Sequence, residues 1–165
     1  MTASAKGLFR ATGNTAKPVM ADLINGEAVY VDGVVREEND FYPTPPEPTR
    51  ALLNAESGYL KRFTDIWEPA AGDGAMVSEI EREGYAVFPS DLIDRGAGAD
   101  IRSFYHFSTP PAKAIITNPP FQECNSGEWV RHALLNLGVE YMALLLPLNW
   151  PGAQSRAGLW AKLPP

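Results

Sequence analysis

One stretch of the chain, residues 114–121, constrains its fold more than any other. It reads Ala-Ile-Ile-Thr-Asn-Pro-Pro-Phe, a short apolar and β-branched run that ends at an amide, two prolines and an aromatic ring. Four to eight apolar residues between breakers are typical of a buried strand in a parallel sheet. Pro119 and Pro120 cannot donate a ladder hydrogen bond, so the strand has to end there. The stretch therefore predicts an α/β protein with Asn118 and Phe121 at the carboxyl edge of a central strand, where ligands bind in such sheets.

The side chains of this turn suit a planar base that carries an amino group. Asn118 offers an amide oxygen and Pro119 a backbone carbonyl, and two adjacent acceptors can hold both hydrogens of an amine while Phe121 stacks on the ring. A proline-rich β–α loop with an incidental aromatic residue is the alternative. The turn resembles the signature Asp/Asn/Ser-Pro-Pro-Tyr/Phe/Trp of the S-adenosylmethionine-dependent amino methyltransferases. That resemblance makes Asn118, Pro119, Pro120 and Phe121 candidate catalytic residues, with Phe121 also binding the substrate.

A glycine turn earlier in the chain favours the same fold. Residues 65–68 predict a strand, and residues 75–83 predict the helix that follows it. Between them, Gly72 and Gly74 permit backbone conformations and close approaches that a Cβ would block, so a ligand can lie against the main chain there. The third glycine of the dinucleotide-binding fingerprint is absent, because Val77 stands at its position.

The turn instead resembles the methyltransferase loop Asp/Glu-x-x-x-Gly-x-Gly, since residues 68–74 read Glu-Pro-Ala-Ala-Gly-Asp-Gly. The cofactor that this resemblance implies is S-adenosyl-L-methionine, with Glu68, Ala70, Gly72 and Gly74 as candidate contacts. In the family, the acid that corresponds to Glu68 lies near the amino group of the cofactor. Ala70 occupies a position that is often glycine in other methyltransferases.

Two further segments match cofactor contacts through the resemblance alone. A segment similar to Tyr-Pro-Thr-Pro precedes the glycine turn in the amino methyltransferases and touches the methionine end of the cofactor, which makes Thr44 and Pro45 candidates. A rigid linker is the alternative for that segment. The family also often has an acidic–apolar pair in which the acid reaches the adenine amino group and the apolar side chain covers its ring. Asp100 and Ile101 match this pair in type and order.

Residues 85–91 predict a second strand that ends in an acid, Asp91. An acid about 20 residues beyond a glycine loop, at the end of the next strand, is placed to accept hydrogen bonds from both ribose hydroxyls. Asp91 is therefore a candidate cofactor-binding residue. Asp94 is a less well placed alternative.

The rest of the pattern completes a doubly wound order of strands and helices. Further strands are expected within residues 99–104, 113–117 and 141–147, and helices within residues 128–137 and 154–162. Trp150 follows the last of these strands at the same carboxyl edge. It is a candidate wall of the substrate pocket, and a buried tryptophan that caps the core is the alternative.

The chain divides into three parts by composition. Residues 1–17 are small and polar and predict a mobile tail, and residues 18–40 predict a small β-meander with turns at Asn25-Gly26 and Asp32-Gly33. Residues 41–165 predict a Rossmann-like, mostly parallel sheet of class I methyltransferase type with about five strands. That family normally has seven strands, so we expect this domain to be incomplete, with an exposed sheet edge that an oligomer or a completing partner can cover.

Composition narrows the classes of function. Fourteen basic and twenty acidic residues give a formal charge of −6, which argues against a generic nucleic-acid-binding surface but not against a local basic groove. A single cysteine, Cys124, fits a reducing compartment. No apolar run approaches the roughly 18 residues of a membrane span, and no signal peptide is visible, so we expect a cytoplasmic protein without a membrane partner. His106 and His132 lack metal-ligand spacing, so no metal is expected.

These observations together predict S-adenosylmethionine-dependent methyl transfer to an exocyclic amino nitrogen. N6 of adenine in DNA is the expected target, which makes DNA the expected partner. Methylation of a protein glutamine or of cytosine N4 is the alternative enzymatic function. A truncated, catalytically silent cofactor-binding module is the non-enzymatic one.

Overall fold

The computed structural model describes residues 19–21, 28–30 and 43–163, and the chain forms two compact units, Met1–Glu37 and Glu38–Pro165. In the first unit, β1 (Val19–Ala21) and β2 (Ala28–Tyr30) pair as an antiparallel ribbon. Both strands fall in the segment for which the sequence predicts a β-meander. The expected mobile tail at residues 1–17 and the expected turns at Asn25-Gly26 and Asp32-Gly33 lie outside the described residues.

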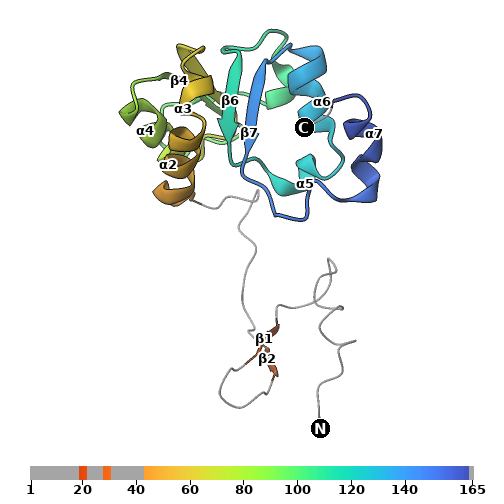
Figure 1. The fold of residues 1–165 in the computed structure, drawn as a ribbon. Helices are drawn as coiled ribbons and strands as arrows, with labels where there is room; N and C mark the ends of the chain where they lie inside the picture. Colours follow the sequence, from red (N-terminus) through yellow and green to blue (C-terminus); the bar gives the residue numbers. More distant parts are fainter. Residues whose placement is uncertain (1–18, 22–27, 31–42, 164–165) are drawn as a thin grey trace. The chain divides into compact units, whose positions relative to one another are not determined.

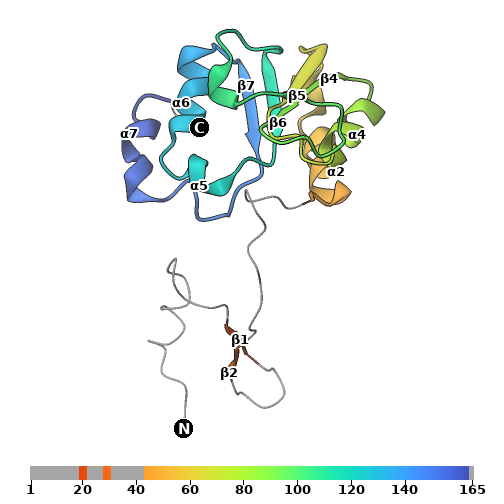
Figure 2. The same cartoon turned by 180° about the vertical axis from the view of Figure 1, so that it is seen from behind.

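The second unit is built on a five-stranded sheet in which every strand pair is parallel (Figures 1 and 2). In spatial order the strands are β5 (Asp100–Ile101), β4 (Ala86–Asp91), β3 (Asp65–Glu68), β6 (Ala114–Thr117) and β7 (Tyr141–Leu144). The chain enters this sheet at its central strand, β3, and continues outward through β4 and β5. It then returns to the other side of β3 and forms β6 and β7. This order confirms the predicted Rossmann-like doubly wound sheet and places its topological switch point between β3 and β6.

Helices cover both faces of the sheet. Figure 1 shows the sheet from its β7 edge, with α2 (Pro46–Ala55), α3 (Ser57–Leu60) and α4 (Ala75–Arg82) on one side. On the other side lie α6 (Glu128–Arg131) and α7 (Ala157–Trp160), and α5 (Phe121–Cys124) follows the carboxyl end of β6. Short helical turns complete the unit: the 3-10 turns Phe104–His106 and Gln154–Arg156 and the π-helical turn His132–Asn136. Within the described residues, no helix has both the length and the apolarity that a bilayer crossing needs.

The strand pleat divides the core into two clusters. Ile66 and Ile116 pack with apolar side chains of α2, α3 and α4, whereas Trp67 and Ile115 pack with those of α6 and α7. Neighbouring residues of a strand point to opposite faces, so a sheet with helices on both sides needs apolar residues at every position. This is why the apolar run of β6 shows no alternation.

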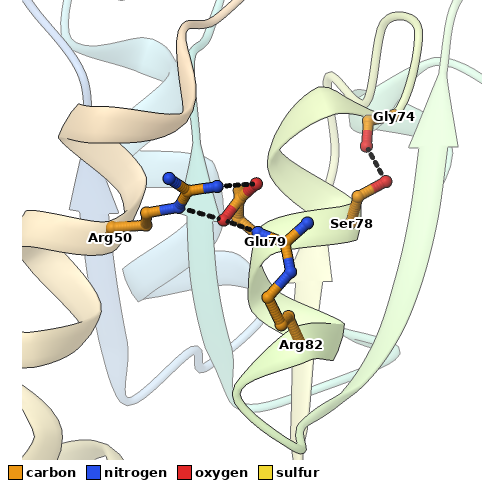
Figure 3. A network of polar contacts seen from close by, with 5 residues as sticks. All are labelled: Arg50, Gly74, Ser78, Glu79 and Arg82. Atoms are coloured by element: carbon orange, nitrogen blue, oxygen red, sulfur yellow. Dashed lines mark hydrogen bonds and ion pairs between the residues drawn. The ribbon is translucent and has the colours of Figure 1, made fainter.

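A buried carboxylate links the two helices that lead into the candidate site. Glu79 of α4 accepts hydrogen bonds from Arg50 of α2, at 2.6 Å from Nε and 3.1 Å from Nη2, and also pairs with Arg82 (Figure 3). These hydrogen bonds, that from Arg50 foremost, lower the pKa of Glu79. Helix α2 begins just after Thr44, and α4 begins just after Gly74. The Glu79 ion-pair cluster (Arg50, Glu79 and Arg82) therefore fixes both segments relative to each other.

Candidate functional site

The candidate residues gather along one edge of the sheet because parallel strands end on the same side. Glu68 ends β3, Asp91 ends β4, and Asn118 directly follows β6. These three strands are adjacent in the sheet, with β3 between the other two. The edge therefore brings the glycine turn, the acid of the second strand and the Asn-Pro-Pro-Phe turn to the switch point, where ligands bind in open α/β sheets.

Glu68 lies at the centre of this edge and is 1% exposed. The hydroxyl Oγ1 of Thr117, across the switch point on β6, donates a hydrogen bond to Oε1 of Glu68. The second oxygen, Oε2, is buried and has no hydrogen-bond partner within the described part of the chain. The pKa of Glu68 is raised to about 8, chiefly by burial; the Thr117 hydroxyl and the Ala70 N–H act to lower it, and the nearby Asp91 carboxylate acts to raise it.

Thr117 was not among the residues that the sequence singled out. It is fully buried and is the last residue of the apolar strand β6, just before Asn118 and the two prolines. A hydroxyl at the last position of an otherwise apolar central strand is the signal that identifies such a residue, because a buried hydroxyl needs a partner at that edge.

Thr44 and Asn118 are joined although they are far apart in the sequence. The side-chain amide of Asn118 donates from Nδ2 to Oγ1 of Thr44 at 3.0 Å, and Thr44 is 8% exposed. Pro45, next to Thr44, is exposed and precedes the first residue of α2. With Nδ2 bonded to Thr44, the other end of the amide, Oδ1, can accept a hydrogen bond from an amino group.

The rest of the Asn-Pro-Pro-Phe turn is compact. Pro119 is buried, whereas Pro120 and Phe121 are half-buried. The carbonyl of Pro120 accepts backbone hydrogen bonds from Glu123 at 3.1 Å and from Cys124 at 3.2 Å. These bonds start helix α5 at Phe121, which follows the end of β6 after the three intervening residues of the turn, so Phe121 stands close to that strand end in the chain.

The glycine turn folds around the carboxylate of Asp91. Gly72 and Gly74 have left-handed φ angles of 56° and 83°, as the sequence predicts for a tight turn. The backbone N–H of Gly72 donates to Oδ2 of Asp91 at 2.8 Å, and the N–H of Ile93 donates to Oδ1 at 2.9 Å. Asp91 therefore holds the turn in place as well as facing the site, and each oxygen keeps a further lone pair for a ligand hydroxyl.

The remaining candidates of this region lie farther out along the same edge. Asp100 and Ile101 form β5, where Ile101 pairs in register with Asp91. Asp100 forms an ion pair with Arg102 at 3.2 Å, and Ile101 is 49% exposed. Ala70 is half-buried in the glycine turn. Asp94, the alternative acid, is exposed and accepts a hydrogen bond from the N–H of Gly96 within its own loop.

Trp150 lies in the core, which corresponds to the second of the two interpretations that its sequence position allows. Its Nε1 donates to the carbonyl of Cys124 at 3.2 Å, and the guanidinium of Arg156 lies 4.4 Å from its ring centroid. The ring belongs to the same apolar cluster as Trp67. Trp150 therefore supports helix α5 from within.

His132 and Cys124 take structural positions. His132 packs against the ring of Phe104 and lies 3.2 Å from Asn136 through Nδ1. Cys124 is buried, and burial raises the pKa of its thiol to about 12. Across residues 43–163 and the two N-terminal strands, no group of three His, Cys, Asp or Glu side chains is placed to hold a metal ion.

Comparison of the chain with protein-family models, with curated proteins and with solved structures finds no match in any of the three. The functional argument therefore depends on the chemistry of the switch-point residues.

Proposed function

We propose that this chain is an S-adenosylmethionine-dependent methyltransferase that acts on an exocyclic amino nitrogen, with N6 of adenine in DNA as its target. The observation that carries the proposal is the meeting of Glu68 and the Asn-Pro-Pro-Phe turn at the switch point between β3 and β6. One side of this point offers a buried acid for a cationic ligand, and the other offers two acceptors and an aromatic ring for a planar amine.

The residues present fit the proposed cofactor. The orphaned oxygen Oε2 of Glu68 suits an ammonium group, and the carboxylate of Asp91 has lone pairs for two ribose hydroxyls. Ile101 presents exposed apolar surface for the adenine ring, next to Asp100 for its amino group. When bound, S-adenosylmethionine supplies a methyl group on a positively charged sulfur.

The Asn-Pro-Pro-Phe turn orients the target amine. Oδ1 of Asn118 and the carbonyl of Pro119 accept the two hydrogens of the target amine, which turns the nitrogen lone pair toward the methyl group. The ring of Phe121 stacks on the base that carries the amine. One amine hydrogen leaves as a proton after transfer, so the nitrogen ends as a neutral methylamine and no covalent enzyme intermediate is needed.

A nucleobase is favoured over other acceptors by Phe121. Phe121 is half-buried and is the first residue of helix α5, directly after the turn that carries the Asn118 and Pro119 acceptors. Stacking on an aromatic ring recognises the flat face of a base, whereas a glutamine side chain offers no ring. Protein glutamine and cytosine N4 are alternative outcomes of the test below.

The test is a transfer assay with labelled S-adenosylmethionine and three acceptors side by side: unmethylated genomic DNA in duplex and single-stranded form, unfractionated protein, and free nucleosides. Mass spectrometry of the digested product identifies the methylated atom. We expect N6-methyladenine, and we expect Asn118→Ala to abolish it while binding of S-adenosylhomocysteine persists. Asn54→Ala changes an exposed asparagine of α2 and is the matched control. Binding without transfer to any acceptor would instead identify a silent cofactor-binding module.

A further inference from the structure

The Glu68 carboxyl is buried, and no cation is among the described groups that act on its pKa. Its surroundings supply the Thr117 hydroxyl from β6, the Ala70 N–H from the glycine turn and the Asp91 carboxylate from β4. None of these groups, which are those that act on its pKa within the described residues, is a cation. An ionised carboxylate under such conditions is costly, and proteins avoid the cost by keeping the proton or by bringing in a counter-charge.

The nearby helices do not supply that counter-charge. Arg50 of α2 and Arg82 of α4 are both paired with Glu79 (Figure 3). In the glycine turn, Asp73 is exposed and accepts a hydrogen bond from the N–H of Ala75 at 3.1 Å, and it carries the same sign as Glu68. Within the described residues, then, neither helix offers an unpaired cation to an ionised Glu68, and a cationic ligand can supply one.

We propose that Glu68 is a proton-linked binding group, a neutral acid in the free protein that ionises when the ammonium group of an amino-acid-bearing ligand pairs with Oε2. This inference rests on the proposed function, since the ligand is the methionine part of the cofactor. The O–H bond of the acid breaks, its proton passes to the buffer, and the ammonium keeps its own hydrogens. If the ammonium group first gives a proton to the buffer and the neutral amine then takes the proton of Glu68, the ion pair and the net release of one proton are the same.

The structure supports this step at both carboxyl oxygens. Oε1 accepts a hydrogen bond from Thr117, which favours the ionised form of Glu68. Oε2 is buried without a hydrogen-bond partner among the described residues, which disfavours the ionised form until a ligand donates to it. An ammonium group supplies both the donor and the missing charge. Ligands that share the adenosine part but lack the amino acid cannot do so.

The experiment measures proton release by titration calorimetry of S-adenosylhomocysteine at about pH 6.5, well below the pKa of Glu68, in buffers with different ionisation enthalpies. The observed enthalpy should change with the buffer by an amount that corresponds to about one proton released per ligand bound. Methylthioadenosine, which lacks the amino-acid part, should release none. Glu68→Gln keeps an acceptor for Thr117 and should bind without proton release.

Infrared spectroscopy provides a second measurement that does not depend on the variant folding. The C=O band of a protonated, buried carboxylic acid should be present in the free wild-type protein and disappear when S-adenosylhomocysteine is added. No band in the free protein, or a buffer-independent enthalpy with wild-type binding intact, overturns the inference and leaves the proposed function standing. A folded wild-type chain that does not bind S-adenosylhomocysteine overturns both.

Discussion

Nδ2 of Asn118 donates a hydrogen bond to Oγ1 of Thr44 at 3.0 Å, joining two segments that lie 74 residues apart in the sequence. The bond attaches the segment before α2 to the Asn-Pro-Pro-Phe turn. It also decides which end of the Asn118 amide remains for an acceptor. Thr44 therefore acts on the proposed reaction through Asn118, in addition to any contact with the cofactor.

We expect Thr44→Val, which keeps the shape but removes the hydroxyl, to lower the rate of methyl transfer by about 10–100-fold, because misplacement of an orienting group has effects of this size. Thr44→Ser keeps the hydroxyl and should retain most of the rate. Single-turnover transfer rates and S-adenosylhomocysteine affinity should be measured for both. Equal rates in the valine variant and the wild type would remove Thr44 from the positioning role.

Asp91 holds the glycine turn and is proposed to bind the cofactor ribose, and two different substitutions separate these roles. Asp91→Ala leaves the N–H groups of Gly72 and Ile93 without their acceptor, which costs about 1–3 kcal/mol for the buried Gly72 and less for the half-buried Ile93. Asp91→Asn keeps one oxygen and should stay closer to wild-type stability while losing about tenfold or more in S-adenosylhomocysteine affinity, since a charge-assisted hydrogen bond is lost. Calorimetry and urea unfolding of both variants test this. Asp94→Asn, at an exposed acid of the same loop, is the control and should change neither quantity.

Glu68 should make the stability of the free protein depend on pH in an unusual direction. Its pKa is about 8 in the folded chain and near the ordinary glutamate value of 4.5 when unfolded. The folded state thus binds more protons between these values, so the contribution of Glu68 is fully present below 4.5 and is lost as pH rises toward 8. The wild type should lose roughly 1.4 kcal/mol per pH unit relative to Glu68→Gln over that range.

Urea unfolding at a series of pH values measures this difference directly. Above the folded pKa of about 8 the two curves should run parallel, because Glu68 is then ionised in both states of the wild type. A difference between wild type and variant that stays constant with pH would show that Glu68 is ionised in the folded protein throughout.

The sheet and its binding edge could be predicted from the sequence because breakers mark the strand ends. Prolines follow the strand that precedes Asn118, Pro69 and then the glycine turn follow the strand that carries Glu68, and Asp91 stands at the end of a short β-rich run. Parallel strands end on one side, so their terminal residues must converge once the strand order is known. The residues that line the carboxyl edge of the sheet thus follow from the sequence signals at the strand ends and from the rule that parallel strands end on the same side.

The pairings across that edge could not be predicted in the same way. The bond from Thr117 to Glu68 and the bond from Gly72 to Asp91 join residues on different strands, and no local periodicity encodes them. The sequence does not decide the placement of Trp150 for a related reason, because an aromatic residue after a strand can face either the site or the core. Its bond to the Cys124 carbonyl decides for the core.

Cys124 should be inert toward thiol reagents in the folded protein. The residue is buried, its pKa is raised to about 12, and only the thiolate reacts. We expect no modification by a disulfide reagent at about pH 8 in buffer, and one thiol to react once denaturant is added. Rapid modification of the native chain would show that the core around Trp150 and Cys124 opens readily.

The Glu79 ion-pair cluster should control how firmly α2, and therefore Thr44, is held against the glycine turn. Glu79→Gln removes the charge that pairs with Arg50 and Arg82 while keeping the side-chain shape, so the α2–α4 contact should weaken. Because the pKa of Glu79 is lowered, the stabilisation is present above the ordinary glutamate pKa of 4.5 and is lost as pH falls through the folded pKa.

Hydrogen exchange of the α2 backbone amides is the measurement that checks this contact. Exchange should be faster in Glu79→Gln than in the wild type at neutral pH, and S-adenosylhomocysteine should bind more weakly because the Thr44 segment is less well placed. Glu81→Gln changes an exposed glutamate of the same helix and should leave both quantities unchanged. If exchange in α2 is equally slow in both variants, apolar packing of Leu53 against α4 holds the helix without the ion pairs.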